Sequence, residues 1–134
     1  MNSPLLHGES DLDTLLKGMD PVLHPEIFVF TTFNNSQDIA TLDPIMMFKE
    51  SEGTTLIITQ ATAEREEVQF EFPCRMITLN VHSALDAVGF LARVTGRLAE
   101  LGMGVNPVAG FYHDHLFIPV NLAEDAMVAL CEWS

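Results

Sequence analysis

The sequence has few basic residues, few cysteines and no long hydrophobic run. Six Lys and Arg residues stand against 19 Asp and Glu residues, which gives a formal net charge of −13. Nucleic acids and anionic membrane surfaces bind basic patches, so this balance argues against both as partners. No apolar run is long enough to span a membrane, and the first residues lack a basic-then-apolar signal peptide. We therefore expect a cytoplasmic protein that binds neither nucleic acid nor membrane.

The motifs of common enzyme classes are also missing. The sequence contains no GxSxG motif, no P-loop and no GxGxxG motif. Cys74 and Cys131 are far apart and form no CxxC motif, so neither a disulfide framework nor a zinc site is indicated. We predict no catalytic residue, no enzymatic activity and no cofactor.

The group His113-Asp114-His115 has the composition of a metal site. Apolar runs on both sides place it at a hairpin tip, where the two histidine rings diverge, and no HExxH or Cys-rich spacing accompanies it. We predict a solvated or hydrogen-bonded turn and no metal ligand. A metal-dependent enzyme that uses His113 and His115 is the third and last of the functional interpretations.

The strongest structural pattern lies in the second half of the chain. The β-branched and aliphatic run at residues 76–81 predicts a strand. A helix is predicted for residues 87–101, because four apolar residues repeat there at helical spacing: Leu91, Val94, Leu98 and Leu101. On the opposite face, Arg97 and Glu100 are spaced to form an ion pair. Gly102 stands where a helix commonly ends in a left-handed residue.

The rest of the chain predicts short helices and strands around this pattern. We expect helices at residues 11–19, near Ala61, and from Ala123 to the C-terminus. Strands are expected at residues 27–33, 45–49, 55–59, 68–72, 105–111 and 116–120. About nine N-terminal residues are expected to be poorly structured, and Pro73 is expected to break the strand before it.

A short repeat organises these elements into two halves. Asp43-Pro44-Ile45-x-x-Phe48 parallels Asn106-Pro107-Val108-x-x-Phe111, which indicates an internal repeat. The second half follows the order β-α-β-β-α, one strand short of a ferredoxin-like βαββαβ unit. The first half has no helix between its first two strands, and we expect the helix at residues 11–19 to fill that place. The predicted fold class is α+β, with two ferredoxin-like subdomains packed side by side and the helix of the first displaced to the N-terminus.

The stretch SALDAVGFLARVTGRLAELGMGVN closely resembles the signature of ACT domains, which are small ferredoxin-like modules that bind amino acids. The signature positions are occupied by Asp86, Gly89, Leu91, Val94, Leu98, Gly102 and Asn106. The segments LLKGMDPVLHPEIFVF, LDPIMMFKESEGTTLIIT and NPVAGFYHDHLFIPV resemble an uncharacterised bacterial family of tandem ACT-like proteins. That family is similar in layout to the ACT repeats of eukaryotic arginine sensors. The resemblance implies two ACT-like subdomains, residues 1–67 and 68–134, of which the second carries the signature.

The turn at residues 85–89 is the place where a ligand has a physical reason to bind. It precedes a helix, where unpaired N–H groups and the helix dipole favour a carboxylate. Gly89 would let a ligand approach the backbone, and Asp86 would accept hydrogen bonds from an ammonium group. The candidate ligand-binding residues are Ala84, Leu85, Asp86, Val88, Gly89, Phe90, Val105 and Asn106. The alternative is that Asp86 or Ser83 caps the helix and Gly89 only lets it pack on the sheet.

Two functions follow from these observations. The first is a regulatory or sensor module that binds a small molecule, an amino acid by the resemblance, and thereby changes subunit or domain association. The second is a non-catalytic oligomerisation domain that associates through sheet edges or helices without a ligand. A region at residues 85–106 that is filled by side chains and holds no water would favour the second function. Both functions predict a homo-oligomer.

Overall fold

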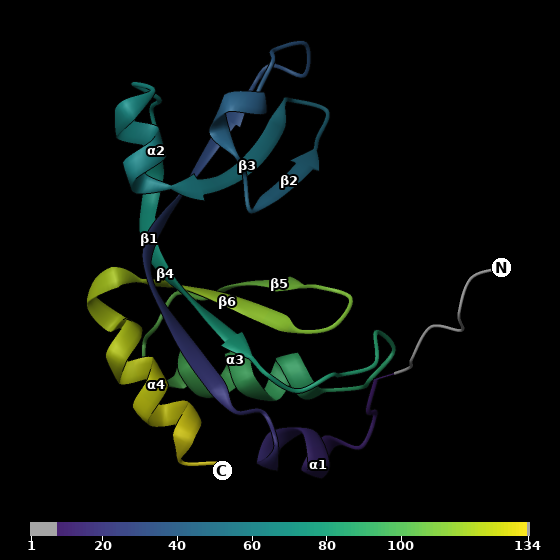
Figure 1. The fold of residues 1–134 in the computed structure, drawn as a ribbon. Helices are drawn as coiled ribbons and strands as arrows, with labels where there is room; N and C mark the ends of the chain where they lie inside the picture. The colour runs from purple at the N-terminus through teal and green to yellow at the C-terminus, as the bar shows by residue number, and fades with distance from the viewer. Residues whose placement is uncertain (1–7, 134) are drawn as a thin grey trace, which may run out of the picture. The chain divides into compact units, whose positions relative to one another are not determined.

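The computed structural model describes residues 8–133, which form four α-helices and six strands (Figure 1). In chain order these are α1 (Leu12–Lys17), β1 (Pro21–Phe33), β2 (Met46–Lys49), β3 (Thr54–Thr59), α2 (Gln60–Arg65), β4 (Glu71–Leu79), α3 (Phe90–Glu100), β5 (Asn106–Ala109), β6 (Asp114–Pro119) and α4 (Ala123–Cys131). Two short 3-10 helices, η1 (Ala40–Leu42) and η2 (Val120–Leu122), precede β2 and α4. Within residues 8–133, no helix is long and apolar enough to cross a membrane.

The chain forms two compact units that interleave along the sequence. The central unit is Pro25–Arg75, and the discontinuous unit consists of residues 8–24 and 76–133. The long strands β1 and β4 each contribute residues to both units. The division of the chain into two ACT-like subdomains, residues 1–67 and 68–134, stays a prediction.

The start of β1 closes the sheet of the discontinuous unit. The strand order β2-β3-β1-β4-β6-β5 puts β1 beside β4, and the N–H of Asn80 donates to the carbonyl of Asp20 at 3.3 Å. A ferredoxin-like unit needs a strand at this place, and within residues 8–133 no strand follows α4. The start of β1 therefore supplies the remaining strand of the sheet that residues 76–133 form.

The start of β4 closes the sheet of the central unit in the same way. Its order is β2-β3-β1-β4, so β4 is an edge strand in this unit. Pro73 lies inside β4 and does not break it, which makes the predicted break wrong. An edge strand tolerates proline because the missing N–H group removes no ladder hydrogen bond on the open side. Phe72, with φ of 60°, adopts a left-handed conformation just before this proline.

The hydrophobic core of the discontinuous unit joins one face of its sheet to three helices (Figure 1). Buried side chains from five elements meet there: Leu15 and Leu16 of α1, Ile77 and Leu79 of β4, Val94 and Leu98 of α3, Leu116 and Ile118 of β6, and Ala126 and Leu130 of α4. Helix α1 therefore forms at the N-terminus as predicted, and its apolar side chains pack with those of α3. Arg97 of α3 pairs with Glu132 at the end of α4, with Nη2 and Oε2 2.7 Å apart, so the predicted pair between Arg97 and Glu100 is wrong. Between β1 and β2 the central unit has only η1.

The core of the central unit is smaller. Its buried residues are Val29, Leu42, Leu56, Ile58 and Ala63. Leu56 and Ile58 alternate along β3, as expected for one face of a strand. The predicted hairpin is confirmed, since β2 pairs antiparallel with β3 and Met46 lies opposite Ile57.

Candidate functional site

Helix α3 begins without a side-chain cap. It starts at Phe90, three residues later than predicted, and its N-cap residue is Gly89, whose φ is 88°. Within residues 8–133 no side chain caps the first turn, and the Ser83 hydroxyl bonds to Asp114 instead, so the alternative that Asp86 or Ser83 caps the helix is wrong. The first intrahelical bond runs from the N–H of Arg93 to the carbonyl of Gly89. The N–H groups of the first turn therefore remain open to a carboxylate, with the helix dipole in favour.

Asp114 is a buried carboxylate on the neighbouring strand. Its exposed fraction is 5%, and the hydroxyl of Ser83 donates a hydrogen bond to its Oδ2 atom at 3.0 Å. Burial raises the pKa of Asp114, and the bond from Ser83 and the nearby histidines His115 and His113 counteract this in part. Of the two predicted alternatives, a solvated or a hydrogen-bonded turn, the solvated one is wrong for Asp114, which is buried and hydrogen-bonded and lies in β6 rather than at the hairpin tip.

The start of α3 and Asp114 line the same cavity. The cavity has a volume of about 80 Å³ and is lined by Ser83, Ala84, Leu85, Ala87, Phe90, Leu91, Ala109 and Asp114. A cavity of about 10–15 Å³ already admits one water molecule, so this space has room for water. It is too small for a drug-sized ligand, which needs at least about 300 Å³.

The structure brings three of the eight predicted ligand-binding residues to this cavity. Ala84, Leu85 and Phe90 line it. The other five do not line it: Asp86, Val88, Gly89, Val105 and Asn106. Asp86, Val88 and Asn106 are exposed, and a ligand-binding role for these five stays a prediction. The analysis of sequence patterns missed Asp114 as a site residue, although its alternation with Leu116 and Ile118 would place it on the helix-covered face of a strand.

The N-terminal segment runs along the turn that precedes α3. The N–H of Glu9 donates to the carbonyl of His82 at 2.6 Å, and the carbonyl of Glu9 accepts from the N–H of Ala84 at 2.8 Å. A Cβ atom on Gly8 would lie 2.4 Å from the carbonyl carbon of Ser83, so only glycine fits there. The prediction that about nine N-terminal residues are poorly structured is therefore wrong for Gly8 and Glu9. The other residues of that segment, 1–7, lie outside the described part of the chain.

A chain of hydrogen bonds connects two histidines through Thr78. The Thr78 hydroxyl lies 2.8 Å from Nε2 of His24 and 3.0 Å from Nδ1 of His115. Because the hydroxyl has one hydrogen, at least one ring must donate to its oxygen. Burial lowers the pKa of His115; the neighbouring His113 and His24 act in the same direction, and Asp114 counteracts them in part. Among residues 8–133, no group of three or more His, Cys, Asp or Glu side chains is placed to hold a metal ion.

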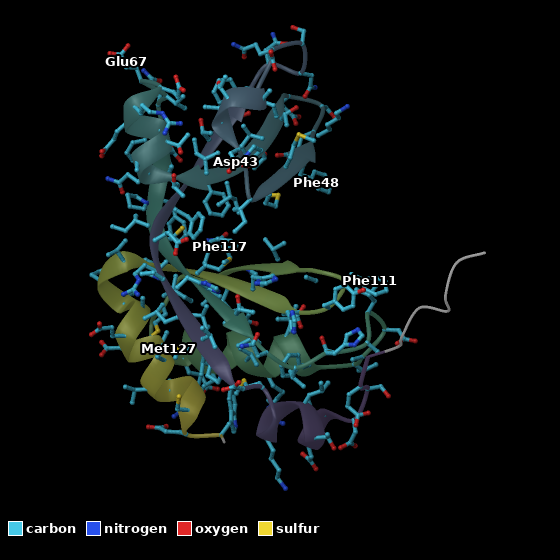
Figure 2. The ribbon with its side chains drawn as sticks, viewed as in Figure 1. Asp43, Phe48, Glu67, Phe111, Phe117 and Met127 are labelled. Carbon is cyan, nitrogen blue, oxygen red and sulfur yellow. The ribbon has the colours of Figure 1, made fainter. Side chains whose placement is uncertain are left out.

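His82, Phe111 and Tyr112 form an aromatic cluster, in which His82 directly precedes the cavity-lining residue Ser83 in the sequence. The ring centroids of Phe111 and Tyr112 are 4.9 Å apart, and the ring of His82 lies 5.3 Å from that of Tyr112. Figure 2 shows Phe111 at the turn of the hairpin formed by β5 and β6. Phe111 and Tyr112 are both exposed, at 43% and 57%. Exposed rings of this kind are available to contact a ligand or partner.

Comparisons with known proteins identify both halves of the chain. Two family models, each described as an ACT domain, match residues 7–75 and residues 71–132. No curated protein matches the chain. The family matches confirm the predicted tandem arrangement and the ferredoxin-like α+β fold.

Solved structures agree with the family matches. A protein of unknown function from Vibrio cholerae, described as a possible transport protein, is 39% identical, with a TM-score of 0.83 over 91% of this chain and 94% of that one. A protein from Agrobacterium tumefaciens is 18% identical, with a TM-score of 0.68 over 81% and 83% of the two chains. The ligand-free regulatory subunit of aspartate kinase from Thermus thermophilus is 10% identical, with a TM-score of 0.65 over 88% and 99%. The last two show a shared fold.

Proposed function

Because the chain belongs to the ACT-domain family, we propose that it is a regulatory module that binds a free amino acid in the cavity beside Asp114. One observation carries this proposal: a single small cavity is lined by an uncapped helix start and by a buried carboxylate. The helix start carries a partial positive charge and Asp114 is acidic. This pairing complements the carboxylate and ammonium groups of an amino acid.

Each end of the ligand has a defined partner in this proposal. The α-ammonium group binds the carboxylate of Asp114, which the hydrogen bond from the Ser83 hydroxyl holds in place. The α-carboxylate accepts hydrogen bonds from the N–H groups of Phe90 and Leu91 in the first turn of α3. The cavity has no room for a large side chain, so the ligand's side chain extends past Leu85, which is 71% exposed.

Regulation requires that the ligand bind one state better than another. A ligand shifts an equilibrium only by its difference in affinity for the two states. Ligand contacts made at once to the turn, to α3 and to β6 would favour the arrangement in which these elements are in place. The proposal assigns no catalysis to the chain, and the regulatory subunit from Thermus thermophilus offers a fold-level analogy for such a role.

Thermal unfolding in the presence of each L-amino acid tests the proposal. A ligand at a concentration one hundred times its Kd stabilises the folded state by about 2.7 kcal/mol. We expect one amino acid, or a chemically related group, to raise Tm at millimolar concentration. The D-enantiomer serves as the control, because it cannot place all three substituents as the L-form does. Unchanged Tm with every L-amino acid would contradict the proposal.

A further inference from the structure

The aromatic cluster of His82, Phe111 and Tyr112 lies at the tip of the hairpin formed by β5 and β6. The N–H of Gly110 donates to the carbonyl of His113 at 2.9 Å, so Phe111 and Tyr112 are the two residues of the hairpin loop. Figure 2 shows Phe111 at this loop. The ring of His82 meets the loop from the segment before α3, with its centroid 6.3 Å from that of Phe111 and 5.3 Å from that of Tyr112.

The aromatic cluster adjoins the cavity beside Asp114. Ser83 and Asp114 line this cavity and are hydrogen-bonded at 3.0 Å. His82 directly precedes Ser83, and Tyr112 lies two positions before Asp114. Two stretches of chain therefore run from the cavity to the rings, and they are in contact at both ends. The rings are one or two residues of extended chain away from the cavity, which is about 3–7 Å.

We propose that the amino acid bound beside Asp114 has an aromatic side chain, which packs on the rings of Phe111 and Tyr112. This inference rests on the proposed function and adds the class of ligand. The cavity of about 80 Å³ has no room for a ring, so the side chain of the ligand lies outside it. A side chain of phenylalanine, tyrosine or tryptophan is long enough to reach the aromatic cluster, whereas those of alanine and serine end short of it.

The exposure of the two loop rings supports a ring as their partner. Phe111 and Tyr112 contact each other edge to face, with an interplanar angle of 70°, and are 43% and 57% exposed. Each ring therefore keeps surface that a third ring can cover. Aromatic side chains bury about 150–250 Å² each and favour the offset or edge-to-face contacts that such a cluster offers.

Apolar side chains around the cavity favour an uncharged ligand side chain over a basic one. Leu85 lines the cavity and is 71% exposed, and Val88 in the same turn is 85% exposed. A lysine or arginine side chain could also lie over a ring, but covering its charge with apolar groups costs hydration unless a carboxylate pairs with it. In the proposed site the carboxylate of Asp114 is already bound to the ammonium group.

Isothermal titration of the full-length chain with single amino acids tests this inference. The ligands are L-phenylalanine, L-tyrosine and L-tryptophan, compared with L-leucine, L-arginine and L-alanine. We expect at least one aromatic ligand to bind about ten times more tightly than each of the other three, because only an aromatic side chain gains the ring contacts. Tyr112 is the only tyrosine of the chain, so its ring protons give one identifiable set of NMR signals. A bound aromatic ligand should shift these signals.

Two variants and one control assign the effect to the aromatic cluster. Phe111→Ala and Tyr112→Ala remove exposed rings, so each should leave Tm unchanged and weaken binding of the aromatic ligand about fivefold or more. Phe48→Ala is the matched control, because Phe48 is a 65% exposed phenylalanine of β2 in the central unit. It should leave the affinity unchanged.

The outcomes separate this inference from the proposed function. Binding of no amino acid would overturn both. Leucine, arginine or alanine binding at least as tightly as every aromatic ligand would overturn the aromatic class alone. The same holds if both loop variants bind the aromatic ligand like Phe48→Ala, or if the Tyr112 signals stay in place when the ligand is bound.

Discussion

Ser83 and Asp114 are hydrogen-bonded at 3.0 Å although 31 positions separate them in the sequence. This bond joins the turn before α3 to the first residue of β6. It fixes the orientation of a carboxylate that is 5% exposed, and it satisfies one of the two oxygen atoms. A buried carboxylate that keeps acceptor capacity beside a small cavity is the chemical basis of the proposed amino-acid site.

Asp114→Asn should abolish most amino-acid binding without unfolding the protein. The amide keeps the shape of the side chain and can accept from Ser83, but it cannot form an ion pair with an ammonium group. Loss of one partner from a buried, hydrogen-bonded charge pair typically costs about 2–5 kcal/mol, so we expect affinity to fall by a factor of about 30 or more. Isothermal titration with the amino acid found by thermal unfolding measures this loss.

The paired control for this variant is Asp125→Asn on α4, an exposed acidic residue outside the cavity. It should leave the affinity unchanged. Equal affinity of Asp114→Asn and the wild type would show that the ammonium group does not bind Asp114, even if the protein binds an amino acid elsewhere.

Gly8→Ala should detach the N-terminal segment from the turn at residues 82–84. The new methyl group would lie 2.4–2.6 Å from backbone atoms of Ser83 and Ala84, which cannot move without disturbing the turn. Overpacking of this kind typically costs about 1–3 kcal/mol. Amide hydrogen exchange should report faster exchange at Ala84, whose N–H group bonds to the carbonyl of Glu9.

Gly104→Ala is the matched control for this substitution. A Cβ atom at Gly104 would meet nothing within 4 Å, so exchange at Ala84 should not change. Retained protection of Ala84 in Gly8→Ala would contradict the close approach of the N-terminal segment.

The pKa of His115 predicts that stability falls as the solution becomes mildly acidic. Burial lowers the pKa of His115 in the folded state below its ordinary value of 6.5. The unfolded chain then binds the proton more readily, so the free energy of unfolding increases with pH between the folded-state pKa and about 6.5. In urea titrations at about pH 7.5 and about pH 5.5, His115→Asn should lose less stability on acidification than the wild type. An equal loss in both proteins would contradict a buried, neutral His115.

The two cysteines should differ strongly in reactivity. Burial raises the pKa of Cys74 to about 12, and its thiol donates to the carbonyl of Phe28 at 3.3 Å. Cys131 is exposed at the end of α4. A thiol-reactive dye should therefore label Cys131 rapidly in the native protein and both thiols in urea, and Cys131→Ser should remove the fast phase. A fast phase that survives this substitution would show that Cys74 is accessible.

The local elements could be predicted well because short-range patterns decide them. The apolar repeat predicted the buried face of α3 in part, since Val94 and Leu98 are fully buried, whereas Leu101 lies after the last helical residue and is 49% exposed. Gly102 adopts the left-handed conformation predicted for it, with φ of 79°. The start of α3 was placed too early because residues 87–89 continue the helical pattern, whereas the left-handed Gly89 delays the helix to Phe90.

The candidate site could be predicted only in part. Ala84, Leu85 and Phe90 could be singled out because a helix start attracts anions whatever surrounds it, and they line the small cavity, while their role in ligand binding stays a prediction. Asp114 was missed because a His-Asp-His group between apolar runs has the composition of a hairpin tip. Its burial depends on Ser83 and on the side chains of α3, which lie far from it in the sequence.

The sequence by itself determined the amphipathic faces, the hairpins and the tandem ferredoxin-like pattern, because side-chain spacing and turn residues act over a few positions. The tertiary structure alone decided that the start of β1 closes the sheet of the discontinuous unit and that the start of β4 closes that of the central unit. Backbone N–H and C=O groups are the same in every extended segment, so the spacing of side chains within a strand does not determine which distant strand it pairs with. It follows from which pairing buries the apolar side chains of the whole chain, and the same burial places Asp114 beside the start of α3.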